Sequence, residues 1–154
     1  MQDQFTSEGI VLENALAFWV HRVYQATQNA SYAAFREAKV ELTPEQWVVL
    51  VALWRTDGQS QNALCELTFR DKPTMSRMIA GLEERGLVIR RESPSDARSR
   101  LVYLTKVGKG LEPKLVPIAE QIVTRMTAGI PERDLLTTRK TLQKLFENLQ
   151  QQSP

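Results

Sequence analysis

A capped amphipathic helix followed directly by a basic hairpin lies at the centre of this 154-residue chain. Asp71 can cap a helix over 72–85, and Gly86 can end it. Four apolar residues of this helix occupy positions i, i+3, i+4 and i+7 and therefore share one face: Met75, Met78, Ile79 and Leu82. Two runs of β-branched or apolar residues follow, at 87–91 and 101–104, with a polar loop between them. This order predicts a β-hairpin immediately after an amphipathic helix.

Three further helices are expected before this segment. A long helix with a wide apolar and aromatic stripe is expected over about 8–35. Thr43 can cap a second helix, and Gln46 completes a capping box with it. The expected buried stripe of this second helix comprises Trp47, Leu50, Val51 and Trp54. Ser60 can cap a short third helix over 61–67.

Two more helices are expected after the hairpin. Thr105 can cap the first, a break follows at 129–131, and the second runs to about Gln150 with apolar residues at helical spacing. The predicted fold class is therefore mainly α with a small β-hairpin (α+β).

The basic charge is concentrated in the middle of the chain. The formal net charge is only +2, but residues 68–109 hold ten Lys or Arg against five Asp or Glu, a net charge of +5. Residues 1–67 have a net charge of −4, and residues 110–154 of +1. A surface that meets phosphates is expected to have such a positive segment, although a solvated basic face gives the same pattern.

The expected location is the cytoplasm. The single cysteine cannot form an internal disulfide, and the first ten residues lack the basic start and apolar run of a signal peptide. Charged residues also interrupt every apolar region, so no membrane span is expected.

The helix and the hairpin together have the chemistry of a DNA-binding surface. The major groove admits one α-helix, whose first residues reach base edges. The first turns of the helix over 72–85 supply hydrogen-bond donors: Lys72, Thr74, Ser76 and Arg77. The hairpin carries arginines that can reach the backbone or the minor groove: Arg90, Arg91, Arg98 and Arg100. We therefore interpret residues 41–105 as a winged helix-turn-helix between helical flanks.

Several short segments match the pattern of a known family. They are residues 64–67, 71–77, 82–88 and, most specifically, the Asp-Ala-Arg-Ser run at 96–99 followed by 101–105. In these segments the chain resembles the MarR family of bacterial transcriptional regulators, and the resemblance covers nearly its whole length. It implies a homodimer held together by helical regions at 1–40 and 106–154. Each dimer would bind double-stranded DNA at a pseudo-palindromic site, and a small-molecule effector or thiol oxidation would weaken that binding.

The resemblance also implies roles for individual residues. In the recognition helix, about 72–85, five residues would face the groove: Lys72, Pro73, Thr74, Ser76 and Arg77. In the wing, about 87–104, Arg98 would enter the minor groove and Asp96 would brace it. The basic character of the wing, rather than the resemblance, makes Arg100 a further candidate DNA contact. The expected function is a sequence-specific, ligand-responsive repressor.

Three residues are candidates for an effector pocket between the dimerisation and DNA-binding regions: His21, Tyr24 and Trp54. The plainer interpretations are a surface or interface position for His21 and a core position for Trp54. Cys65 also has two interpretations. It can pack beneath the recognition helix as a small apolar residue, or it can act as a redox sensor, which requires solvent access.

Other classes of function have little support in the sequence. The chain has no Gly-rich phosphate loop, no nucleophile motif and no Cys/His pair at a recognisable spacing, so neither an enzyme nor a cofactor is expected. One histidine and one cysteine fall short of the usual four zinc ligands, so no metal is expected either. The remaining alternative is a winged-helix module that binds protein rather than specific DNA. It predicts a neutral wing, in contrast to the charge of residues 68–109.

Overall fold

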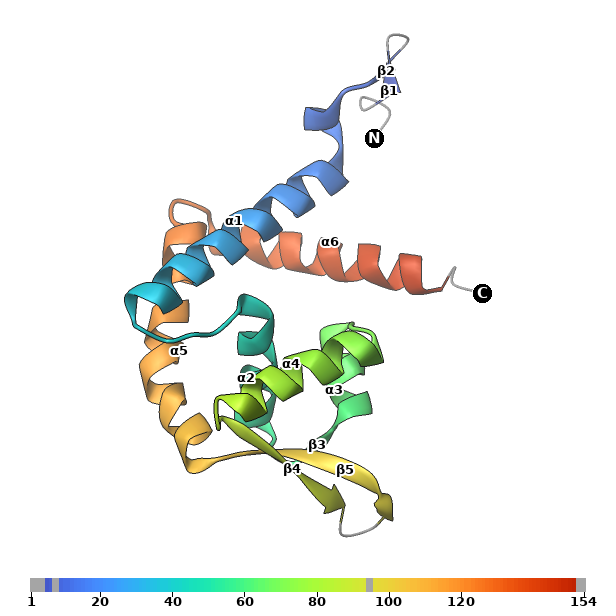
Figure 1. The fold of residues 1–154 in the computed structure, drawn as a ribbon. Coiled ribbons are helices and arrows are strands. Elements are labelled where there is room, and N and C mark those ends of the chain that lie inside the picture. Colours follow the sequence, from blue (N-terminus) through green and yellow to red (C-terminus); the bar gives the residue numbers. More distant parts are fainter. Residues whose placement is uncertain (1–4, 7–8, 94–95, 152–154) are drawn as a thin grey trace. The chain divides into compact units, whose positions relative to one another are not determined.

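The structure is a computed structural model that describes residues 5–6, 9–93 and 96–151, without the side chains of residues 5, 6, 10, 93 and 96–99. The chain divides into two compact units, residues 1–119 and residues 120–154. The helices, shown in Figure 1, are a short 3-10 helix η1 (Leu12–Asn14), α1 (Leu16–Glu37), α2 (Pro44–Arg55), α3 (Gln61–Thr68), α4 (Lys72–Glu84), α5 (Lys106–Thr127) and α6 (Glu132–Gln150).

The described strands form two small antiparallel sheets. They are β1 (Phe5–Thr6), β2 (Gly9–Ile10), β3 (Gln59–Ser60), β4 (Val88–Ser93) and β5 (Asp96–Leu104). β1 pairs with β2, and β5 lies between β3 and β4. The β4–β5 hairpin runs from Val88 opposite Leu104 to Ser93 opposite Asp96, with an irregularity between Glu92 and Ser93. This hairpin is the predicted wing.

Three of the predicted caps are confirmed at the starts of α2, α3 and α4. The Thr43 hydroxyl accepts from the Gln46 amide at 3.1 Å, and the Gln46 side chain accepts in return from the Thr43 amide at 3.2 Å. The Ser60 hydroxyl accepts from the Ala63 amide at 3.1 Å, and so begins α3. These side chains satisfy amides that have no partner within the helix.

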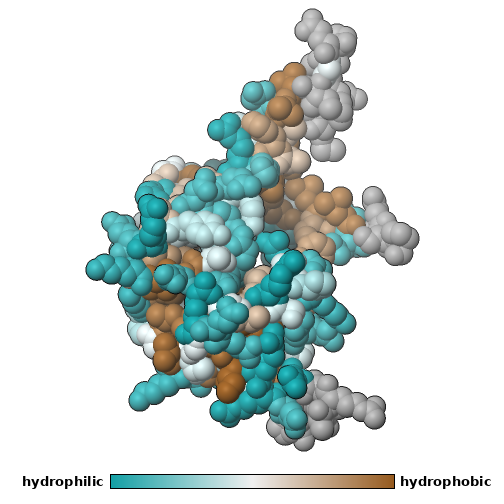
Figure 2. All heavy atoms as spheres, in the orientation of Figure 1, coloured by the Kyte–Doolittle hydropathy of each residue, from teal (hydrophilic) through white to brown (hydrophobic). Residues whose placement is uncertain are grey.

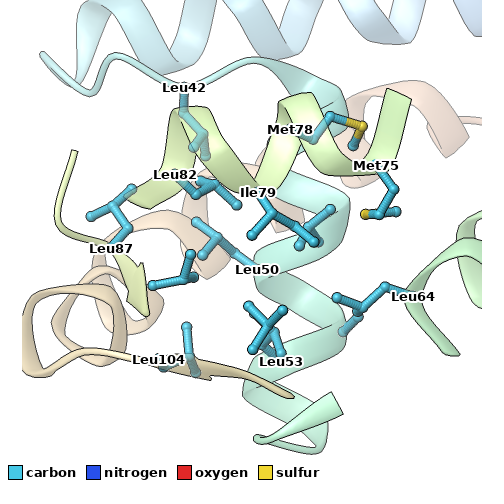
Figure 3. Close-up of a cluster of buried hydrophobic side chains, with 14 of the residues drawn as sticks. Leu42, Leu50, Leu53, Leu64, Met75, Met78, Ile79, Leu82, Leu87 and Leu104 are labelled. Carbon is cyan, nitrogen blue, oxygen red and sulfur yellow. The ribbon is translucent and has the colours of Figure 1, made fainter. Parts of the chain in front are cut away.

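The core of the first unit lies between α2, α3, α4 and the sheet. Figure 3 shows its side chains pointing toward one another from all of these elements. Leu50, Leu53, Leu64, Ile79 and Leu82 are completely buried. The predicted apolar face of α4 is confirmed, since Met75, Met78, Ile79 and Leu82 are all buried. The core therefore holds α4 by one face and leaves its opposite face at the surface.

Three details differ from the sequence-based expectations. The first long helix begins at Leu16 rather than near residue 8. In α2, Val51 is exposed, and the buried positions next to Leu50 are Val49, Ala52 and Leu53. The strands of the wing extend to Ser93 and from Asp96, so most of the polar stretch at 92–100, which was expected to be a loop, lies in β4 and β5.

A tight backbone contact joins the start of α5 to Leu87, the residue just before β4. A Cβ atom at Gly108 would lie 2.1 Å from the carbonyl oxygen of Leu87, which is closer than such atoms approach. The Thr105 hydroxyl accepts from the Gly108 amide at 3.0 Å, so the predicted cap of α5 is present. On the other side, the Trp54 indole donates to the Gly108 carbonyl at 3.0 Å. We call this contact the Gly108 seam.

Candidate nucleic-acid interface

The first turn of α4 is organised by Asp71. One carboxylate oxygen of Asp71 accepts from the Thr74 amide, and the other accepts from the Thr74 hydroxyl, each at 2.8 Å. These two hydrogen bonds hold the pKa of Asp71 below its ordinary value, and the bond from the Thr74 backbone amide has the larger effect. Pro73 is tolerated in the first turn because proline has no amide hydrogen, and amides in the first turn have no hydrogen-bond partner within the helix. The predicted cap of the recognition helix is thus confirmed and carries a negative charge at neutral pH.

The five residues predicted to face the groove all lie on the first two turns of α4. Lys72, Pro73 and Arg77 are exposed, whereas Thr74 and Ser76 are half-buried. Arg77 Nη2 donates to the Thr74 hydroxyl at 3.2 Å, and that hydroxyl itself donates to Asp71. The Thr74 hydroxyl is therefore engaged within the helix, while Lys72 and Arg77 present the exposed positive charges of this face.

Two of the predicted DNA-binding residues of the wing have side chains that lie outside the described ones. The backbone of Asp96 and Arg98 lies in β5, but their side chains are not among the described ones. Arg100 is exposed and lies opposite Glu92 in the β4–β5 pairing. Arg91 lies over the Tyr103 ring, with its guanidinium carbon 5.9 Å from the ring centre.

Arg90 is partly covered and ion-paired, although the sequence predicted the same DNA-contacting role for all four wing arginines. Its guanidinium forms an ion pair with Glu83 and donates to the Ser76 carbonyl at 3.2 Å. Only 23% of its side chain is exposed. The sequence did contain a sign of this difference. Side chains alternate between the two faces of a strand, so Arg90 shares a face with the buried Val88.

A polar hollow of about 390 Å³ lies where α3, α4 and the wing meet. Its lining residues are Ser60, Gln61, Asn62, Ser76, Arg90, Arg100 and Val102. Gln61 also donates to the Lys72 carbonyl at 3.1 Å and thereby ties α3 to the start of α4. The sequence-based reasoning missed the contribution of Gln61 and Asn62, although both follow the predicted cap at Ser60.

None of the three candidate effector residues lines the polar hollow beside the wing. Trp54 packs edge-on against Trp47, with ring centres 5.3 Å apart, in addition to its bond in the Gly108 seam. His21 is exposed on α1. The Tyr24 hydroxyl accepts from Gln28 at 2.7 Å and from Arg70 at 3.3 Å. Trp54 therefore has the structural role that was its plainer interpretation.

A different hollow, of about 630 Å³, lies along the C-terminal half of α1 and the following loop. Its lining includes Tyr32, Arg36 and Lys39. Partial burial raises the pKa of Tyr32, the nearby Glu45 and Tyr24 act in the same direction, and a hydrogen bond with Thr43 opposes them.

Cys65 is half-buried and packs against the core of the first unit. This placement agrees with the packing interpretation. Among the described residues, no group of three or more His, Cys, Asp or Glu side chains could hold a metal ion.

Comparison with known proteins identifies the family. The MarR family profile matches residues 41–99, which contain α2, α3, α4 and most of the wing. The transcriptional regulator HosA of Escherichia coli O127:H6 is 31% identical over 126 residues, which cover 79% of this chain and 93% of HosA. The chain belongs to the MarR family. The predicted family and the winged-helix fold are thus confirmed, and members of this family are transcriptional regulators rather than enzymes.

Two solved structures that involve a small molecule are similar to this chain in fold. CouR from Rhodococcus jostii RHA1, solved bound to p-coumaroyl-CoA, has a TM-score of 0.78 and 27% identity, covering 88% of this chain and 94% of CouR. BpsR of Bordetella bronchiseptica, whose DNA binding is regulated by 6-hydroxynicotinic acid, also has a TM-score of 0.78, with 28% identity over 86% of this chain and 93% of BpsR.

No helix in the described ranges has the length and apolar character needed to cross a membrane.

Proposed function

We propose that this MarR-family protein is a cytoplasmic, ligand-responsive repressor that binds a pseudo-palindromic DNA site as a homodimer. The observation that carries the proposal is the exposed polar face on the first two turns of α4, where Lys72 and Arg77 present positive charge beside a basic wing. In this proposal residues 41–105 bind DNA, and residues 1–40 and 106–154 form the dimer.

The proposed DNA contacts follow from this arrangement. Groove contacts come from Lys72, Pro73, Thr74, Ser76 and Arg77. Wing contacts come from Arg98, braced by Asp96, and from Arg100. A helix in the major groove reads base edges, whereas an arginine in the minor groove responds to its width and negative potential.

An exposed apolar stripe on α1 supports the homodimer. Leu16, Trp19, Val20 and Val23 occupy positions i, i+3, i+4 and i+7 and are each between 45% and 53% exposed. Figure 2 shows hydrophobic surface over the N-terminal part of α1. A contiguous exposed apolar patch on a helix marks a protein interface, and we propose a second copy of this chain as its occupant.

A small-molecule effector is proposed by similarity to CouR and BpsR, whose structures concern p-coumaroyl-CoA and 6-hydroxynicotinic acid. Both compounds contain an aromatic ring and an acyl or carboxyl group. We therefore propose an aromatic acid or its thioester as the class of effector to test first, with His21 and Tyr24 as candidate contacts. The structural role of Trp54 makes it a weaker candidate.

Selection of binding sites from a random duplex pool tests the proposed function. A pseudo-palindrome bound by one dimer, with half-sites about 34–36 Å apart, is the expected result. The logarithm of the affinity should fall with that of the salt concentration by about 0.9 for each neutralised phosphate. Enrichment of no sequence by reduced, ligand-free protein would contradict the proposal and favour a protein-binding winged helix. A promoter reporter carrying the selected site then distinguishes repression from activation.

A further inference from the structure

Glu83 and Arg90 join the recognition helix to the first strand of the wing by several bonds at once. The Arg90 amide donates to one carboxylate oxygen of Glu83 at 3.0 Å, and its guanidinium pairs with the other. The guanidinium also donates to the Ser76 carbonyl at 3.2 Å. We call these bonds, between Glu83, Arg90 and the carbonyl of Ser76, the wing bracket.

The wing bracket holds one residue of β4, Arg90, against α4 through both its backbone amide and its guanidinium. The guanidinium meets partners from Ser76, in the second turn of the helix, and Glu83, in its last, two residues that are about two turns apart along α4. Because the amide and the guanidinium are held separately, both the position and the side-chain direction of Arg90 are restrained relative to the helix. The short connection between Glu84 and Val88 cannot supply this restraint, because it joins the strand only to the end of the helix.

The wing bracket also limits how strongly the Arg90 guanidinium can bind a DNA phosphate. Its charge is compensated by Glu83, and most of its side chain is covered. While this pair is intact, the compensated and largely covered guanidinium adds little net attraction for a phosphate. Arg91 and Arg100, by contrast, are exposed on the same hairpin.

We propose that the wing bracket sets the angle between the recognition helix and the wing, and that Arg90 is a positioning residue rather than a DNA contact. The inference rests on the proposed DNA-binding function. A fixed angle allows base contacts by α4 and backbone or minor-groove contacts by the wing to form together on one site. Its loss lowers the preference for that site over other DNA, because non-specific binding depends mainly on charge.

The variant Glu83→Gln gives opposite results for the two roles of Arg90. If Arg90 were a phosphate contact held back by Glu83, removal of the carboxylate charge would release it and tighten binding to all DNA. If Arg90 is a positioning residue, binding to the selected site weakens by about tenfold, the size of one lost charge-assisted hydrogen bond. Glu84→Gln is the matched control, because Glu84 is exposed and the substitution removes the same charge from the same turn.

The experiment measures the affinity of wild type, Glu83→Gln and Glu84→Gln for the duplex that wild type enriches from a random pool and for a scrambled duplex. We expect only Glu83→Gln to lower the ratio of these affinities. Arg90→Lys should lower the ratio as well, with an unchanged salt slope, because an ammonium group cannot span both Glu83 and Ser76. The proposal would be overturned if Glu83→Gln bound DNA more tightly than Glu84→Gln. It would also be overturned if Arg90→Lys kept the wild-type ratio of affinities for the selected and scrambled duplexes.

Amide hydrogen exchange supplies a readout that needs no DNA. The amides of Val88 to Glu92 should exchange faster in Glu83→Gln than in Glu84→Gln, while those of α2 and the core positions of α4 stay protected. Unchanged exchange in β4 would overturn the wing bracket itself. Faster exchange in β4 combined with no enriched duplex for wild type would instead contradict the proposed DNA-binding function and leave the bracket as a structural restraint.

Discussion

The guanidinium of Arg70 donates a hydrogen bond to the hydroxyl of Tyr24 across 3.3 Å, and so connects α1 to the turn that precedes the recognition helix. Gln28 donates to the same hydroxyl at 2.7 Å and to Glu45 at 2.8 Å. A polar chain thus runs from the loop before α4 through α1 to the first turn of α2.

Replacing Tyr24 by Phe tests how much this connection stabilises the fold. Tyr24 is 45% exposed, so water replaces the lost hydrogen bond easily. We expect the free energy of unfolding to fall by less than about 1 kcal/mol. Urea unfolding of wild type and Tyr24→Phe measures the difference. A loss above about 2 kcal/mol would show that the Tyr24 hydroxyl is the centre of a cooperative network.

The Asp71 cap predicts a pH dependence of stability. Because hydrogen bonds from Thr74 lower the folded-state pKa of Asp71 below its ordinary value of 3.8, the ionised form stabilises the folded state. This contribution is fully present above about pH 4 and is lost as the pH falls through the lowered pKa. Asn caps helices without a titrating charge, so Asp71→Asn lacks this component.

Unfolding of wild type and Asp71→Asn is therefore compared across a series of pH values from neutral to strongly acidic. The difference in unfolding free energy between the two proteins should be constant at neutral pH and change below about pH 4, in the direction that removes the advantage of Asp71. A difference independent of pH over the whole series would contradict a lowered pKa at the cap.

Arg77 is the exposed arginine of the proposed groove face, and Arg77→Ala tests whether it reads a base. We expect a loss of about 1–3 kcal/mol on the selected duplex and a relaxed preference at one base pair. Competition by duplexes altered at single positions measures this preference. Arg36→Ala, at the end of α1 and outside the proposed DNA contacts, removes an equal charge as the control. If Arg77→Ala lost equal affinity for the selected and scrambled duplexes, Arg77 would be a phosphate contact and not a base contact.

The Gly108 seam predicts opposite effects for two glycines in the same helix. A methyl group at Gly108 would collide with the Leu87 carbonyl, so Gly108→Ala should destabilise the fold by about 1–3 kcal/mol. Gly110 has no atom within 4 Å of its ideal Cβ position, and Gly110→Ala should stabilise the helix by up to about 1 kcal/mol. Thermal unfolding of both variants measures the contrast, and equal effects would show that the seam opens at little cost.

Local signals explain most of what the sequence predicted correctly. The caps at Thr43, Ser60 and Asp71 involve residues three positions apart, so the sequence alone contains both partners. The apolar face of α4 was clear because only polar or small residues lie between its large apolar positions. In α2, by contrast, residues 47–54 are all apolar, so periodicity could not select the buried face and Val51 was assigned wrongly.

The remaining errors depend on contacts between distant or differently folded segments. The apolar residues before Leu16 suggested helix, but there the Glu13 carbonyl accepts from the Trp19 indole at 2.7 Å, and a 3-10 turn precedes α1. The length of the wing is set by pairing between β4 and β5, which the polar residues of the hairpin concealed. The role of Arg90 requires Ser76 and Glu83 to be brought together with it by folding.

The Gly108 seam also has a mechanical consequence for a regulator. The Gly108 carbonyl is held by Trp54 of α2, its amide by Thr105, and its Cα lies against the backbone of Leu87 at the base of the wing. The first turn of α5 is therefore in direct contact with both α2 and the base of the wing. In the proposed ligand-responsive regulator, an effector that displaced this part of α5 would displace the base of the wing with it, because no intervening loop separates the two.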